Sequence, residues 1–243
     1  MTYPKHVIGE YETVAKIATG LSIARYGDGE LKILDGFGYT RTHYVAVPAL
    51  TEELRRVIRV PHPRCLIGIP TMDPNGLKYE SFVRHSTRFA KFVREGDGNT
   101  YYSSLITRPD CGTWLETRKY YDALVKIWEH KRRVCVVAEP ESKLLTHVRL
   151  SHADVTHVPC PMYNAYAEID RMQTAVIATR PDIALLSIGV VATALAYRLT
   201  HAGIHAVDLG SVGGFLIRWR TGAPKPARRE DYAKEREGGP ENN

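Results

Sequence analysis

Two carboxylates separated by one residue, Asp28 and Glu30, have the clearest chemical potential in this sequence. They belong to the stretch Arg-Tyr-Gly-Asp-Gly-Glu at residues 25–30. Because glycines flank Asp28, we expect a loosened backbone that lets both carboxylates turn toward one hard cation, Mn²⁺ or Mg²⁺. Such a cation neutralises charge on a leaving nucleoside diphosphate, and Arg25 is suited to pair with a phosphate.

The same carboxylate spacing also occurs in solvated surface turns, so it does not identify a site without its context. Other metal ligands are less well arranged, since the histidines at positions 43, 62, 85 and 157 show no ligand spacing. What the carboxylates can do therefore depends on the elements that position them.

Seven runs rich in apolar and β-branched residues predict strands. They cover residues 21–26, 65–69, 100–106, 134–138, 155–158, 183–188 and 206–209. Several are apolar throughout, as expected for strands that helices cover on both faces. Helices are predicted at 115–131, at 164–180 with Asn164 as N-cap and Pro181 as terminator, and at 191–202 before Gly203.

This alternation predicts an α/β fold with a single doubly wound, mostly parallel Rossmann-like sheet and helices on both faces. One domain is expected over residues 1–221. Residues 222–243 hold almost nothing apolar and predict a flexible charged C-terminal tail. Ligands of such sheets bind at the carboxyl ends of strands, which is where residues 25–30 fall.

The formal charge of +6 suits an anionic partner, such as a diphosphate donor, a nucleic acid or an acidic membrane surface. No apolar run is long enough to span a bilayer, and the first 20 residues lack a signal-peptide core. The four cysteines form no Cys-x-x-Cys pair, which favours reduced thiols. A cytoplasmic protein is therefore expected, bacterial or, if phage-encoded, in the host cytoplasm.

Residues 22–30 resemble the start of the GT-D-type glycosyltransferases, bacterial enzymes marked by an Asp-x-Glu metal and donor motif. The likeness continues in order through Leu-Ile-Gly-Ile-Pro at 66–70, Ser-Leu-Ile-Thr-Arg-Pro at 104–109 and a helix at 120–128. It then includes an Asn-Ala-Tyr helix start within 161–170 and strand segments at 188–197 and 206–210. The ordered series spans about residues 20–212 and is more specific than any single motif.

The resemblance implies a metal-dependent glycosyltransferase that moves a sugar from a nucleoside-diphosphate sugar, expected to be a UDP-sugar, to a glycan or glycoconjugate. Asp28 and Glu30 match the metal and donor positions. Arg25 and Arg108 match arginines expected to hold the diphosphate. Asn164 is equally consistent with donor binding and with capping its helix.

Two segments depart from the family pattern. Where relatives read Gly-Pro-Thr-Ala-Thr, residues 189–193 read Gly-Val-Val-Ala-Thr, so Val190 and Val191 replace proline and threonine while Gly189 and Thr193 remain donor-binding candidates near a helix N-terminus. Residues 211–214 lack the family's histidine and acid. Asp208 and Glu139, carboxylates at strand ends, are the candidate general bases.

Three other functions stay open. A nicotinamide-dependent oxidoreductase would share the sheet, but no Gly-x-Gly-x-x-Gly turn follows the first strand. A nucleic-acid-binding protein would explain Arg84, Arg88 and Lys91 on a helix predicted at 79–95, as would a solvated helix face. A glycosyltransferase acting on modified bases of phage DNA would combine the chemistry with the positive charge.

Overall fold

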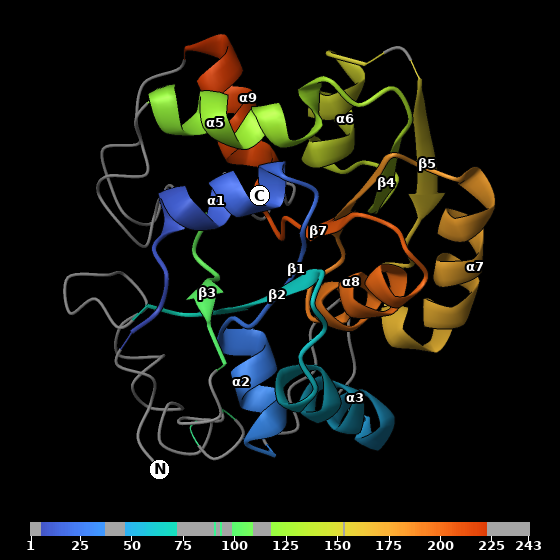
Figure 1. The fold of residues 1–243 in the computed structure, drawn as a ribbon. Coiled ribbons are helices and arrows are strands. Elements are labelled where there is room, and N and C mark those ends of the chain that lie inside the picture. The colour runs from blue at the N-terminus through green and yellow to red at the C-terminus, as the bar shows by residue number, and fades with distance from the viewer. Residues whose placement is uncertain are drawn as a thin grey trace, which may run out of the picture.

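A computed structural model describes residues 6–36, 47–71, 90, 93, 99–108, 118–152 and 154–222. Within these residues one sheet of seven parallel strands has the order β3-β2-β1-β7-β6-β4-β5 (Figure 1). The strands are β1 (Ser22–Arg25), β2 (Cys65–Ile69), β3 (Tyr102–Ser103), β4 (Val134–Ala138), β5 (Val155–Pro159), β6 (Ile183–Ser187) and β7 (Ala206–Asp208). Each lies within or overlaps one of the seven predicted runs, which confirms the α/β prediction.

Helices form a layer on each face of the sheet, above and below it in Figure 1. The first layer contains α1 (Glu10–Ala18), α5 (Arg118–Glu129), α6 (Lys143–Arg149) and α9 (Gly213–Thr221). The second layer contains α2 (Asp28–Leu34), α3 (Pro48–Arg59), α7 (Ile169–Thr179) and α8 (Val191–His201). Both faces of the sheet are therefore covered, as the uniformly apolar strands predict.

Alternating side chains of the central strands supply two separate cores. Ile23 of β1 and Val207 of β7 pack with the first helix layer. Their neighbours Ala24 and Ala206 pack with the second layer. Since successive strand residues point to opposite faces, apolar residues at consecutive positions supply both cores.

The strand order reverses between β1 and β7, which are neighbours although they lie at opposite ends of the chain. The helix that follows β1 is α2, in the second layer, and the helix that follows β7 is α9, in the first. Open α/β sheets bind ligands outside the carboxyl ends of strands where the chain diverges in this way. The fold thus places the ends of β1 and β7 at the expected ligand site.

Two of the four helix predictions are confirmed with shifted bounds. The helix predicted at 191–202 is α8, and Gly203 follows it with φ of 82°, the left-handed conformation expected after a helix. The helix predicted at 115–131 is α5, and residues 115–117 lie outside the described part. Within 164–180 the structure has a 3-10 helix, η3 (Ala165–Glu168), before α7. Helices α1, α2, α3, α6 and α9 were not predicted.

Other predictions fall on residues that the structure does not describe. These include Arg84, Arg88 and Lys91 with most of the helix predicted at 79–95, and all but Gly222 of the predicted tail. Among the helices that are described, none has the length and apolar character needed to cross a membrane.

Candidate active site

Asp28 and Glu30 lie on the first turn of α2, rather than on the loosened loop expected from their flanking glycines. Helix residues two positions apart do not face each other, so the two carboxylates diverge. Glu30 turns back over the helix start, where its Oε2 accepts a 2.7 Å hydrogen bond from the Gly27 N–H. Acidic residues are favourable there because the helix N-terminus carries partial positive charge.

The two carboxylates have different environments. Asp28 keeps 28% of its side chain exposed, and its Oδ2 lies 3.5 Å from Nζ of Lys32. Glu30 is only 8% exposed. Of the pair, Asp28 is therefore the carboxylate that faces solvent at the end of β1.

Arg25, the last residue of β1, is buried and engaged by the protein itself. Its Nη1 donates to the Ser104 carbonyl at 2.8 Å and to Oγ1 of Thr107 at 2.6 Å, while Nη2 lies 3.3 Å from Oδ1 of Asp208. These bonds connect the end of β1 to the segment after β3 and to the end of β7. The structure thus places Arg25 below the surface, where it holds these segments together, and its contact with a diphosphate stays a prediction.

Asp208 ends β7 and is almost fully buried. Its Oδ1 also accepts a 3.0 Å hydrogen bond from the Gly210 N–H. Burial raises the pKa of Asp208 above its usual value, against the opposing effect of Arg25. Gly210 has φ of 51°, and a Cβ there would lie 2.6 Å from Nη2 of Arg25, so any other residue would be strained and would displace the guanidinium.

Glu30 has a pKa raised to about 7, first because of its burial and then because of the nearby charge of Asp208. The backbone hydrogen bonds that it accepts act in the opposite direction. The floor of the site therefore contains two carboxyl groups whose negative charge is unfavourable. An added cation nearby would relieve that cost.

Thr193 and Gly189, both candidates for donor binding, lie at the start of α8 and just before it. The Thr193 hydroxyl is fully buried and donates to the Arg25 carbonyl at 2.7 Å, with Oε1 of Glu30 at 3.4 Å. It supports β1 and Glu30 from within and does not face a ligand. Gly189 is exposed in the turn between β6 and α8, with φ of 60°.

The remaining candidates are more dispersed along the carboxyl edge of the sheet. Arg108 is half-buried at the end of the described segment after β3. Glu139 follows β4, and because β6 lies between β4 and β7, roughly 10 Å of sheet separates it from Asp208. Asn164 follows β5 and occupies the N-cap position of η3, but it has φ of 50° and its side chain makes no capping bond.

Several residues of the site were not predicted. Ser104 and Thr107 hold Arg25, and the Ser187 hydroxyl at the end of β6 donates to the Gly210 carbonyl at 2.8 Å. The sequence does show polar residues at the ends of the apolar runs, and these could have been proposed as site residues. It does not show which of these residues contact each other, because the partners are far apart in the sequence.

Among the described residues, a divalent cation could be held by one carboxylate together with the phosphate oxygens of a bound donor. No group of three or more His, Cys, Asp or Glu side chains in the described residues is arranged to hold a metal ion. Mg²⁺ and Mn²⁺ in phosphate-transferring sites are, however, commonly held by one or two carboxylates together with substrate phosphates. Solvent-facing Asp28, beside buried Glu30, matches that arrangement.

A doubly wound parallel sheet with acidic side chains where its strand order reverses defines a Rossmann-like α/β enzyme. The sequence matches, over residues 23–226, the model of a family described as "Glycosyltransferase GT-D fold". The chain belongs to this family of glycosyltransferases.

Solved structures agree on the fold. A structure titled as a new glycosyltransferase from Streptococcus sanguinis has a TM-score of 0.76 and 20% identity, covering 92% of this chain and 88% of that one. Another, titled as a highly conserved domain with a distinct glycosyltransferase fold, has a TM-score of 0.77 and 20% identity, covering 91% and 84%.

Two longer curated proteins contain a similar region. "Probable glycosyl transferase Gly" of Streptococcus gordonii is 24% identical over 84% of this chain and 31% of its own length. "Glycosyltransferase GlyD" of Streptococcus pneumoniae serotype 4 is 20% identical over 79% of this chain and 25% of its own length. The chain thus spans less than a third of either relative.

Proposed function

We propose that this protein transfers a sugar from a UDP-sugar, with the help of Mn²⁺ or Mg²⁺, to a glycan or glycoconjugate acceptor. The observation that carries the proposal is the solvent-facing carboxylate of Asp28 directly after β1, above the buried group of Glu30, Arg25 and Asp208. The family supports the transfer reaction. The donor, the metal and the acceptor are the proposed parts.

Asp28 is the residue proposed to hold the cation, together with phosphate oxygens of the donor. When bound, a divalent cation supplies positive charge to the diphosphate leaving group. Glu30 contributes negative charge from below, and its raised pKa is the reason that an adjacent cation is favourable. Arg25 holds the buried residues of the site in place, because its guanidinium connects the end of β1 to the segment after β3 and to the end of β7.

The general base for the acceptor hydroxyl is assigned by exposure. Asp208 is enclosed and engaged by Arg25 and Gly210, whereas Glu139 is only partly buried. A base must come within hydrogen-bond reach of the hydroxyl whose proton it removes. We therefore favour Glu139 for that role and assign Asp208 to holding Arg25.

Calorimetric titration of UDP and a panel of UDP-sugars tests the metal and the donor together. Binding is expected with Mn²⁺, and it should weaken at least about tenfold when EDTA is added or when Asp28→Asn removes the charge. The matched control is Glu52→Gln, which removes an exposed carboxylate that is paired with Arg55 on α3. Glu52→Gln should bind the donor as the wild type does.

Equal donor affinity with metal and with chelator contradicts the proposed role of the cation. Equal weakening by Asp28→Asn and Glu52→Gln shows instead that surface charge, and not a specific site, governs binding.

A further inference from the structure

A second feature lies at the same edge of the sheet, after β5. The chain between Pro159 and Arg171 encloses an open hollow of about 470 Å³. That volume falls within the range of small-molecule sites in proteins. Because all strands of the sheet are parallel, the hollow opens along the same edge as Asp28 and Glu139.

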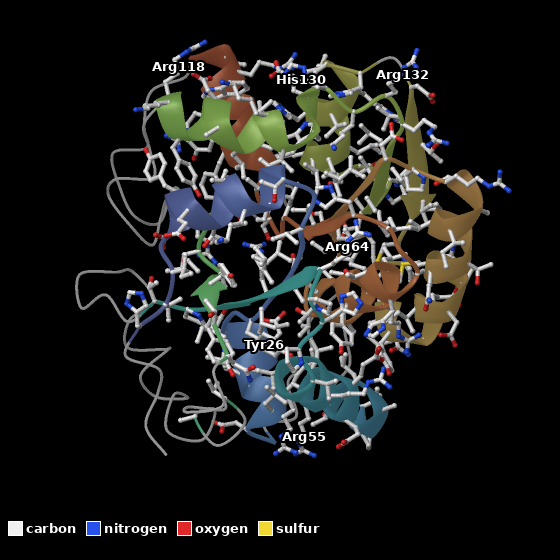
Figure 2. All side chains as sticks on the ribbon, viewed as in Figure 1. Tyr26, Arg55, Arg64, Arg118, His130 and Arg132 are labelled. Atoms are coloured by element: carbon white, nitrogen blue, oxygen red, sulfur yellow. The ribbon has the colours of Figure 1, made fainter. Side chains whose placement is uncertain are left out.

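One of the residues that line the hollow has an exposed aromatic side chain. Tyr163 is 64% exposed, and Met162, its neighbour in the chain, is 56% exposed. The large aromatic side chains of the core, in contrast, are fully buried, as Tyr26 (Figure 2) and Trp128 are. Tyr163 thus presents an aromatic face to solvent beside a concave surface, where nothing in the described fold requires it.

Polar groups complement this exposed aromatic side chain. Asn164 lines the hollow in a left-handed conformation, and its side-chain amide makes no hydrogen bond within the described residues. Nε of Arg171 lies 2.6 Å from Oε2 of Glu168, and its Nη2 donates to the Pro159 carbonyl at 2.9 Å. The hollow therefore offers an amide group together with a carboxylate and a guanidinium that are paired with each other.

The charges of the hollow cancel. Arg171 is paired with Glu168, so no excess positive charge is directed at a ligand. A diphosphate or a nucleic-acid backbone would need unpaired cations. An aromatic face combined with donors and acceptors of balanced charge instead suits a neutral, hydroxyl-rich ring.

We propose that this hollow is a subsite for a sugar ring of the glycan acceptor, with Tyr163 stacking on the ring and Asn164 and Glu168 bonding its hydroxyls. The inference rests on the proposed transfer to a glycan. Strand β5 lies next to β4, so only one strand spacing, roughly 5 Å, separates the end of β5 from the end of β4, which Glu139 follows. The subsite therefore holds a sugar ring of the acceptor close to the proposed base.

The test measures binding of the full chain to a glycan array carrying mono- to hexasaccharides of hexoses, N-acetylhexosamines and pentoses. We expect the wild type to bind oligosaccharides on the array. Tyr163→Ala should weaken that binding at least about tenfold, and Tyr163→Phe, which keeps the ring, should retain it. The control is Leu150→Ala, a truncation of a side chain that is 61% exposed after α6.

The subsite is refuted if the wild type binds no oligosaccharide on the array, or if Tyr163→Ala binds as the wild type does. Titration of the same variants with UDP-sugars and Mn²⁺ separates this result from the donor proposal. If oligosaccharide binding depends on Tyr163 but no UDP-sugar binds, the subsite stands and the donor assignment fails. If UDP-sugar binds and oligosaccharides do not, the donor assignment stands and the subsite fails.

Discussion

The guanidinium of Arg25 is the central connection of the site at the scale of single residues. It joins the Ser104 carbonyl, the Thr107 hydroxyl and the Asp208 carboxylate, which belong to segments far apart in the sequence. A planar fork with fixed donors makes several such bonds at once, whereas an ammonium is a point charge on a flexible stem. A buried carboxylate without its partner is costly, so Asp208 depends on this arrangement.

Arg25→Lys is therefore expected to lower the free energy of unfolding by about 1–3 kcal/mol, since it retains the charge but leaves buried acceptors without a donor. Urea unfolding at pH 7.5 measures the change. The matched control is Arg133→Lys, because Arg133 pairs with Asp182 at 2.8 Å but is 54% exposed. That variant should change stability by less than about 1 kcal/mol. Equal effects would show that Arg25 is no more than another ion-pair partner.

At the scale of elements, α9 explains one departure from the family pattern. A Cβ at Gly213 would lie 2.4 Å from the backbone nitrogen of Leu144, so the start of α9 rests directly on the start of α6. Phe215 and Leu216 of α9 are fully buried in the core of this layer. The glycine within residues 211–214 thus permits close helix packing next to the site.

Gly213→Ala should destabilise the protein by about 1–3 kcal/mol, because backbone atoms of α6 cannot yield as a flexible side chain would. Thermal unfolding measures the effect. Gly9→Ala is the control, since nothing lies within 4 Å of a Cβ at that helix cap. It should cost less than about 1 kcal/mol, the part that remains being the poorer N-cap preference of Ala. Unchanged stability of Gly213→Ala would mean that α9 shifts freely on α6.

The stability of the whole molecule is expected to fall in acid because of a buried histidine in the layer that contains α6 and α9. His147 of α6 is fully buried between Trp128 and Trp219, with ring centroids 6.5 and 6.0 Å away. Burial, together with the charges of Arg220 and His152, lowers the pKa of His147 to about 4. Because this pKa is depressed below the usual 6.5, the neutral ring contributes stability that is present above pH 6.5 and lost as the pH falls through about 4.

Removing the ring makes this prediction measurable. When the pH falls from 7.5 to 5, the wild type should lose about 1–2 kcal/mol more of its free energy of unfolding than His147→Asn loses. Urea unfolding of both proteins at the two pH values gives the difference between their free energies of unfolding. The contributions of the other titrating groups cancel in that difference. The control is His130→Asn at the exposed end of α5 (Figure 2), whose profile should run parallel to the wild type. A parallel profile for His147→Asn would refute the assignment.

The net charge of +6 attracts polyanions, so DNA must be tested as an alternative acceptor. Each phosphate contact adds roughly −0.9 to the slope of log K against log salt on duplex DNA. We expect duplex DNA to be retained at low salt only, and DNA containing hydroxymethylated pyrimidines to receive no sugar. Filter binding over a salt series and a radiolabelled transfer assay measure the two outcomes. Transfer to that DNA would replace the glycan as acceptor.

All seven strands could be predicted from the sequence because burial on both faces requires local runs of apolar residues, and such runs are visible without the fold. The prediction of a site at residues 25–30 had a similar basis, since in parallel sheets ligands bind at strand ends. Helix α8 and the glycine after it were equally local features. The strands, α8 and its terminating glycine can be predicted because they depend on the spacing of apolar residues and on the backbone preferences of a few consecutive residues.

Only the tertiary structure decided what the individual side chains do. It brought Arg25 to Asp208, 183 residues later in the chain, and turned the Thr193 hydroxyl inward. It placed Asp28 and Glu30 on a helix turn that separates them, and put Asn164 in a left-handed conformation where a cap was predicted. Such outcomes depend on burial and on partners distant in sequence, and a local pattern of residue types contains neither.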